Sequence, residues 1–258
     1  MALHKKPIFV FVPGAWHTAD TFDGIRDLLT ARGFESEAVT IPSVGSNDPK
    51  TGLYADTGYT RGIIHELVSN GRQVVVVNHS YGGLVGAGAV EGLGYAQRAK
   101  TGQPGGVIMV VWMAAVVAPK GKSVIDMLGG NWLPWMLLKS PDDGYCYSSE
   151  QEHVFYHDMT PEEQQKAISK LKPHPVSSLL EPVLYEPWHD MPSFFLYFDK
   201  DQALPLQVQE SFAQTLGNPA AFHTDGSHSA FLSMPEQVAG GLELALKTGQ
   251  EQSGIIVN

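Results

Sequence analysis

The sequence predicts an α/β fold with a mostly parallel central sheet and helices on both of its faces. Two patterns indicate this class: short β-branched runs alternate with stretches of helical periodicity, and the valine run within residues 73–77 is too apolar for a strand with one wet face. With 258 residues, 43% of them hydrophobic, the chain can bury a substantial core. We therefore expect one folded domain that carries an insertion.

The first half of the chain alternates between predicted strands and helices. Phe22, Ile25, Leu28 and Leu29 stand at helical spacing, with Gly33 as the stop. The expected strands here cover residues 7–12, 37–41, 73–77 and 107–113, and the expected helices cover residues 21–32 and 59–68 and a stretch that starts near residue 84.

The pattern changes over residues 120–192, where aromatic, proline and charged residues mix without strand periodicity. Thr160-Pro161-Glu162-Glu163 is typical of a capped helix start, with proline at the first helical position. We interpret this segment as a helical cap inserted into a core of residues 1–119 and 193–258. After it we expect a strand over 193–198, a helix over 205–216, a short strand near 221–223 and a helix over 235–246.

Composition excludes several functions. The net charge of −10 has the wrong sign for nucleic acid or an anionic membrane, so neither is an expected partner. The single cysteine, Cys146, forms no internal disulfide, and neither a secretory signal nor an 18-residue apolar span is present, so we expect a cytoplasmic protein. No metal site, phosphate loop or dinucleotide fingerprint is found, and no cofactor is expected. A homodimer is compatible with the sequence.

Ser80 is the candidate nucleophile. Asn78-His79-Ser80-Tyr81-Gly82 lies between the valine-rich strand and a helix that opens with glycines, which is the setting of a nucleophile elbow. The sharp turn of an elbow raises the hydroxyl above the sheet, and only small neighbours fit around it. Asn78 replaces the first glycine of the Gly-x-Ser-x-Gly pattern, so the serine also has a structural interpretation as part of a glycine-rich turn.

A serine nucleophile needs an imidazole base, and the base needs a carboxylate that fixes its tautomer. Asp201 follows the predicted strand over 193–198, and His228 follows the last predicted strand, in the chain order Ser, Asp, His. Because loops at the carboxyl ends of parallel strands converge on one crevice, we expect these three residues to form a catalytic triad. Acyl transfer also needs donors for an oxyanion, and the backbone amides of Ala15 and Tyr81 stand in the required positions.

Four stretches resemble the α/β-hydrolase superfamily, and within it the group of plant methyl esterases, hydroxynitrile lyases and their fungal relatives. They are Phe11 to His17, Asn78 to Gly83, Asp199 to Pro205 and Gly226 to Pro235, and together they span most of the chain. The resemblance implies Ser80 as nucleophile, His228 as base, and the amides of Ala15 and Tyr81 as the oxyanion hole. It also selects Asp201 over the competing Asp199, because the acid of this group stands four residues before a proline.

The sequence departs from that group at two places. Pro13 stands where members usually have histidine before the glycine of the oxyanion turn. The hydroxynitrile lyases of the group carry lysine after the catalytic histidine and threonine in the oxyanion turn, where this chain has Ser229 and Gly14. Cyanohydrin cleavage is therefore disfavoured.

Substrate choice is expected to depend on the cap and on side chains near the elbow. The candidate substrate-binding residues are Trp16, His17, Trp132, Trp135, Met136 and Trp188. The sequence thus predicts a serine hydrolase that cleaves an ester or lactone of a small, largely apolar, aromatic or polyketide-like compound. Two alternatives stay open: a lyase, cyclase or carbon–carbon bond cleaving enzyme that uses the same triad as acid and base, and a ligand receptor on the same fold.

Overall fold

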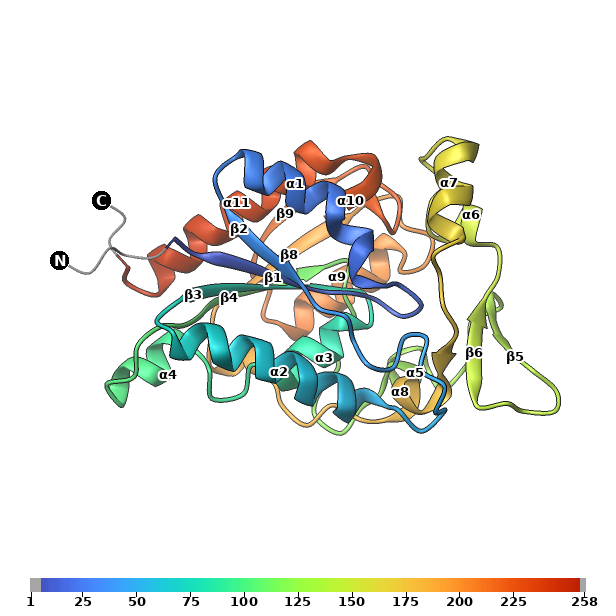
Figure 1. Ribbon diagram of the computed structural model, residues 1–258, viewed down its shortest axis with the longest axis horizontal. Helices are drawn as coiled ribbons and strands as arrows, with labels where there is room; N and C mark the ends of the chain where they lie inside the picture. The colour runs from blue at the N-terminus through green and yellow to red at the C-terminus, as the bar shows by residue number, and fades with distance from the viewer. Residues whose placement is uncertain (1–5, 256–258) are drawn as a thin grey trace.

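One parallel sheet forms the centre of the protein (Figure 1). The computed structural model describes residues 6–255. The expectation that the chain starts without a secretory signal concerns residues that lie largely outside this range. The six strands are ordered β2-β1-β3-β4-β8-β9, and every neighbouring pair is parallel. The predicted fold class, an α/β hydrolase fold with a parallel central sheet, is confirmed.

The inner strands are apolar because both of their faces are covered. They are β1 (Ile8–Val12), β3 (Gln73–His79), β4 (Gly106–Met113) and β8 (Ser193–Phe198). The edge strands, β2 (Glu35–Ala38) and β9 (Ala220–Thr224), carry more polar and exposed residues. The valine run is therefore central, as its composition predicts.

Alternate residues of each strand supply two cores, one on each face of the sheet. Phe9 and Phe11 contribute to one core, and Val10 and Val12 to the other. Figure 1 shows α1 (Asp23–Ala31), α10 (Ala230–Ser233) and α11 (Pro235–Gln252) over the first face, with the short 3-10 helix η1 (Ala19–Phe22) before α1. The other face is covered by α2 (Leu53–Ser69), α3 (Gly82–Ala89), α4 (Tyr95–Lys100) and α9 (Leu206–Thr215).

The segment between β4 and β8 lies at the end of the sheet where the parallel strands finish (Figure 1). Its helices are α5 (Val124–Met127), α6 (Gln151–Val154), α7 (Pro161–Ile168), α8 (Val176–Leu180) and the 3-10 helix η2 (Pro187–His189). The predicted start of α7 is present, with reciprocal hydrogen bonds between Thr160 and Glu163. We call residues 120–192 the cap.

The cap, predicted to be helical, contains these helices and also a three-stranded antiparallel sheet of β5 (Met136–Leu138), β6 (Tyr145–Ser148) and β7 (His174–Pro175), which the sequence analysis did not predict. These strands have two to four residues each, too few to show the alternation by which strands are found in a sequence. In the core, α2 begins at Leu53, earlier than the predicted residue 59. The prediction missed its first turns because the polar Asp56 on the buried face interrupts the apolar pattern.

Candidate active site

Ser80 stands in a tight turn between β3 and α3. Its φ of 52° is in the left-handed region, which a residue with a side chain adopts at a cost in conformational energy. Gly14 of the neighbouring turn approaches so closely that a Cβ atom there would lie 2.8 Å from the Ser80 Cβ. A strained serine between a buried strand and a helix, with a glycine packed against it, has the geometry of a nucleophile elbow.

Asn78, which departs from the elbow pattern, is fully buried under this turn. Its side chain lies against Gly86 of α3, where an added Cβ would be 1.9 Å from the Asn78 Oδ1. Neither amide atom of Asn78 has a hydrogen-bond partner among the described residues. The larger side chain at position 78 therefore fits because the facing helix residue is glycine.

His228 and Asp201 form a buried pair. Asp201 Oδ2 lies 2.7 Å from His228 Nδ1, and the two side chains are 0% and 2% exposed. Asp201 Oδ1 accepts from the amides of Ala203 and Leu204, at 2.7 and 2.9 Å. Because the carboxylate accepts a hydrogen bond from the Nδ1–H group, this tautomer of the imidazole has its lone pair on Nε2.

The described residues include no hydrogen bond between Ser80 Oγ and His228 Nε2. His79, the neighbour of Ser80, links the two turns instead: its Nε2 donates to the His228 carbonyl at 2.8 Å, and the two rings are 4.6 Å apart. Burial holds the pKa of His79 well below its ordinary value, so this imidazole is neutral. The competing acid, Asp199, lies elsewhere and pairs with His223 at 2.8 Å.

The residues that carry the two expected oxyanion donors line the same cavity as Ser80. Ala15, Ser80 and Tyr81 all line it. Within residues 6–255, neither the Ala15 amide nor the Tyr81 amide donates a hydrogen bond to another protein group. Two unused backbone donors beside a serine hydroxyl are what a developing oxyanion requires.

The cavity at Ser80 is small and apolar, with a volume of about 30 Å³. Three of the predicted substrate-binding residues, Trp16, Trp135 and Met136, line it. The other apolar lining residues, which the sequence did not single out, come from the cap and from loops after β4 and β8: Val116, Val124, Leu128, Leu133, Leu179, Ala203 and Leu204. No lining side chain carries a charge.

The other three predicted substrate-binding residues lie away from this cavity. Trp132 is half-buried and packs on the core, and Trp188 packs edge-to-face against Trp112 at 6.0 Å. His17 points into the protein, where Nδ1 donates to the Ala15 carbonyl at 2.8 Å and Nε2 accepts from the Tyr156 hydroxyl at 2.9 Å. None of these three residues lines the cavity at Ser80, because proximity to a motif in sequence does not set the direction of a side chain.

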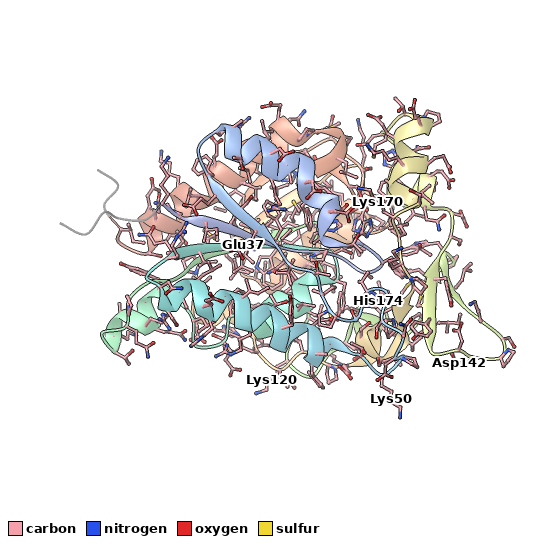
Figure 2. All side chains as sticks on the ribbon, in the orientation of Figure 1. Glu37, Lys50, Lys120, Asp142, Lys170 and His174 are labelled. Carbon is pink, nitrogen blue, oxygen red and sulfur yellow. The ribbon has the colours of Figure 1, made fainter. Side chains whose placement is uncertain are left out.

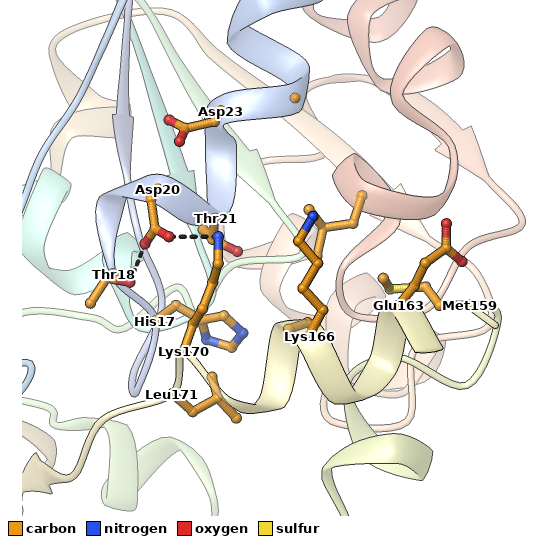
Figure 3. A pocket seen from close by; sticks show the side chains of 13 residues that line it. His17, Thr18, Asp20, Thr21, Asp23, Met159, Glu163, Lys166, Lys170 and Leu171 are labelled. Atoms are coloured by element: carbon orange, nitrogen blue, oxygen red, sulfur yellow. Dashed lines mark hydrogen bonds and ion pairs between the residues drawn. The ribbon is translucent and has the colours of Figure 1, made fainter. Parts of the chain in front are cut away.

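A second, larger cavity of about 390 Å³ lies between η1, α1 and α7 (Figure 3). His17 lies at its inner side, and Asp20 bonds Thr18 and pairs with Lys170 of the cap at 2.7 Å. The hydrogen bonds from Lys170 and Thr18 lower the pKa of Asp20. This cavity contains neither Ser80 nor the oxyanion donors, so it is separate from the candidate active site.

The chain belongs to the alpha/beta hydrolase family, whose model matches residues 9–240. It is similar to the alpha/beta hydrolase nvfD of Aspergillus novofumigatus, with 29% identity over 90% of this chain and 94% of that protein. It is also similar to a pheophorbidase of Raphanus sativus, with 26% identity over 88% and 89%. Among solved structures, polyneuridine aldehyde esterase shares the fold, with a TM-score of 0.76, 16% identity and coverage of 95% and 99%.

Residues 6–255 include no helix with the length and apolar character that crossing a bilayer requires. In the same range, no cluster of three or more His, Cys, Asp or Glu side chains has an arrangement that would hold a metal ion. Cys146 is buried, which raises the pKa of its thiol to about 12, and it is a poor nucleophile for that reason.

Proposed function

We propose that this hydrolase cleaves a carboxylic ester or lactone of a small, largely apolar compound. Ser80 is the nucleophile, His228 the base, Asp201 the acid that orients the base, and the amides of Ala15 and Tyr81 form the oxyanion hole. The observation that carries the proposal is the buried His228–Asp201 pair, which leaves a basic Nε2 in the loop that packs beside the Ser80 elbow.

The reaction follows from these positions. As the Ser80 Oγ attacks the ester carbonyl, its proton passes to His228 Nε2, and the Asp201 carboxylate stabilises the imidazolium. The amides of Ala15 and Tyr81 donate to the oxyanion of the tetrahedral intermediate. His228 then protonates the departing alcohol, and a water deprotonated by the same nitrogen releases the acid and restores Ser80.

The lining of the Ser80 cavity supports an uncharged substrate. A carboxylate or ammonium group on the substrate would find no opposite charge there and would lose its hydration. The small volume of the cavity, about 30 Å³, favours a small acyl group. A larger aromatic acid requires the cap side chains, Trp135 among them, to move aside.

Hydrolysis of p-nitrophenyl acetate by wild type and Ser80→Ala tests this function. We expect the variant to lose about 10⁴-fold or more in kcat while keeping its fold, as seen by circular dichroism. A fluorophosphonate should add its mass to the peptide that contains Ser80, and hydrolysis in heavy-oxygen water should place the label in the released acid. Retention of most activity in Ser80→Ala excludes the covalent route, and an acid without the label excludes hydrolysis.

A further inference from the structure

The turn that carries the Ala15 amide contains a strained residue. Trp16 has a φ of 65°, which places a bulky side chain in the left-handed region. Trp16 is buried, lines the Ser80 cavity and follows directly on Ala15. Such a conformation persists only where the surroundings hold it, so the contacts of Trp16 decide whether the oxyanion donor keeps its direction.

The cap holds Trp16 through three hydrogen bonds. The Trp16 amide donates to His174 Nδ1 at 3.2 Å, and the indole Nε1 donates to the Cys146 carbonyl at 2.9 Å. The Trp16 carbonyl accepts from the Lys172 amide, also at 2.9 Å. Every polar group of Trp16 is therefore bonded to a residue of the cap, and none of these bonds comes from the sheet that carries the turn.

The peptide unit between Ala15 and Trp16 is fixed on both sides. Its carbonyl accepts from His17 Nδ1 at 2.8 Å, and its amide donates to His174 Nδ1. This peptide shares the Ala15 Cα with the peptide that carries the Ala15 amide. Because the two peptides meet at the Ala15 Cα, the hydrogen bonds to the two histidines hold that Cα in place and so limit how far the peptide that carries the Ala15 amide can turn.

His174 is connected to the second oxyanion donor as well. Since its Nδ1 accepts, its Nε2 carries the proton and donates to the Ser43 hydroxyl at 3.3 Å. Ser43 donates through its hydroxyl to Asp56 Oδ2 at 2.6 Å, and the Tyr81 hydroxyl donates to the same oxygen at 2.7 Å. The His174 ring also packs edge-to-face on Tyr81, with centroids 4.9 Å apart.

This chain of groups is buried throughout. His174, Ser43 and Asp56 are 0% exposed and Tyr81 is 2% exposed. Figure 2 shows His174 within the molecule, where the cap meets the core, whereas Lys50 and Asp142 project at its rim. Burial lowers the pKa of His174 to about 3, so its imidazole stays neutral and keeps the acceptor that the Trp16 amide needs.

We propose that His174 is a positioning residue for the oxyanion hole, through which the cap holds both the Ala15 and the Tyr81 turns. The proposal rests on the function proposed above. Because the amides act on the oxyanion and not on the ground-state substrate, loss of this support lowers kcat and leaves KM nearly unchanged. The cap thus supplies a part of the catalytic geometry in addition to a wall of the substrate cavity.

Two substitutions of similar size separate the role of each ring nitrogen. In His174→Asn the amide oxygen stands near the place of Nδ1, so the acceptor for the Trp16 amide is kept. In His174→Gln the polar group stands near the place of Nε2, and this acceptor is lost. His153→Gln is the control, because His153 is an exposed histidine of the same cap and bonds neither the Trp16 turn nor the Ser43–Asp56–Tyr81 chain.

We expect His174→Gln to lower kcat for p-nitrophenyl acetate by about 10- to 100-fold, with KM within about threefold of wild type. His174→Asn and His153→Gln should keep kcat within about threefold. Hydrogen exchange at the Trp16 amide should accelerate by about tenfold or more in His174→Gln only. This readout does not depend on the enzyme being a hydrolase.

The proposal is overturned if His174→Gln and His174→Asn lose kcat equally, if the loss is in KM, or if Trp16 exchange is unchanged in His174→Gln. A wild-type protein that hydrolyses no ester and takes no fluorophosphonate refutes the proposed function instead. In that case the exchange rate at Trp16 still decides whether His174 holds the turn.

Discussion

Three buried histidines predict that the protein loses stability in mild acid. Burial lowers the pKa of His17 to about 4 and that of His174 to about 3, and it holds the pKa of His79 well below the ordinary 6.5. In the unfolded chain these imidazoles take up protons that the folded protein excludes. Their contribution to stability is therefore complete above about pH 6.5. It is lost as the pH falls from there toward the pKa values of these histidines in the folded protein.

The size of the effect follows from the linkage between proton binding and folding. At about pH 5.5, each imidazole that is neutral only in the folded state lowers the free energy of unfolding by about 1 to 2 kcal/mol. Three such groups together lower it by about 4 kcal/mol, a large part of the roughly 5 to 15 kcal/mol that stabilises a typical domain.

Urea unfolding followed by circular dichroism, at intervals between about pH 7.5 and 5.5, measures this loss. His17→Gln and His174→Gln each remove one of the three groups, so each should reduce the fall in unfolding free energy over this range by about a third. His65→Gln changes an exposed histidine on α2, so the decrease in unfolding free energy with pH should be the same in this variant as in wild type. A wild-type loss below about 1 kcal/mol, or the same fall in His174→Gln as in wild type, refutes the reasoning.

Three substitutions test the candidate site. Asp201→Asn keeps the shape of the side chain but favours the wrong tautomer of His228, so we expect kcat on an aryl ester to fall by about 10⁴-fold with no loss of fold. A decrease of less than about tenfold would argue against Asp201 as the residue that orients His228. Gly14→Ala places a Cβ 2.8 Å from that of Ser80, and steady-state kinetics should show kcat reduced by about tenfold or more; wild-type kinetics would mean that the turn can move aside. Trp135→Ala removes a wall of the small cavity, so the ratio of kcat/KM for p-nitrophenyl octanoate to that for the acetate should rise by about tenfold; an unchanged ratio would place the acyl group elsewhere.

Periodicity and local motifs were enough to find the core of the fold. A few consecutive residues were enough to predict the valine-rich β3, the phenylalanine-rich β8 and the capped start of α7. Strand propensity and helix capping depend on residues that are neighbours in the chain. The strands of the cap were missed because they are two to four residues long and are defined by their partners.

The candidate nucleophile, base and acid were predictable for a similar reason. Each follows a strand, and the ends of parallel strands meet at one edge of the sheet. Position after a strand does not separate Asp199 from Asp201, and only the family resemblance selected Asp201 in the sequence. The structure adds that Asp201 pairs with His228 and that Asp199 pairs with His223. Asp56 stands at helical spacing between the apolar Leu53 and Ile64, on the buried face of α2, and this polar residue at a buried position was a sequence signal of the network behind the oxyanion turns.

The amino-acid sequence alone determined the fold class, the order of the strands in the chain and the candidate triad, because these depend on local propensity and on the chain order of motifs. Tertiary structure decided which side chains line the cavity at Ser80, that His17 points inward, and that His174 of the cap bonds the Trp16 amide. Those features depend on the packing of an insertion against the core, and residues that are 158 positions apart meet only when both parts have folded.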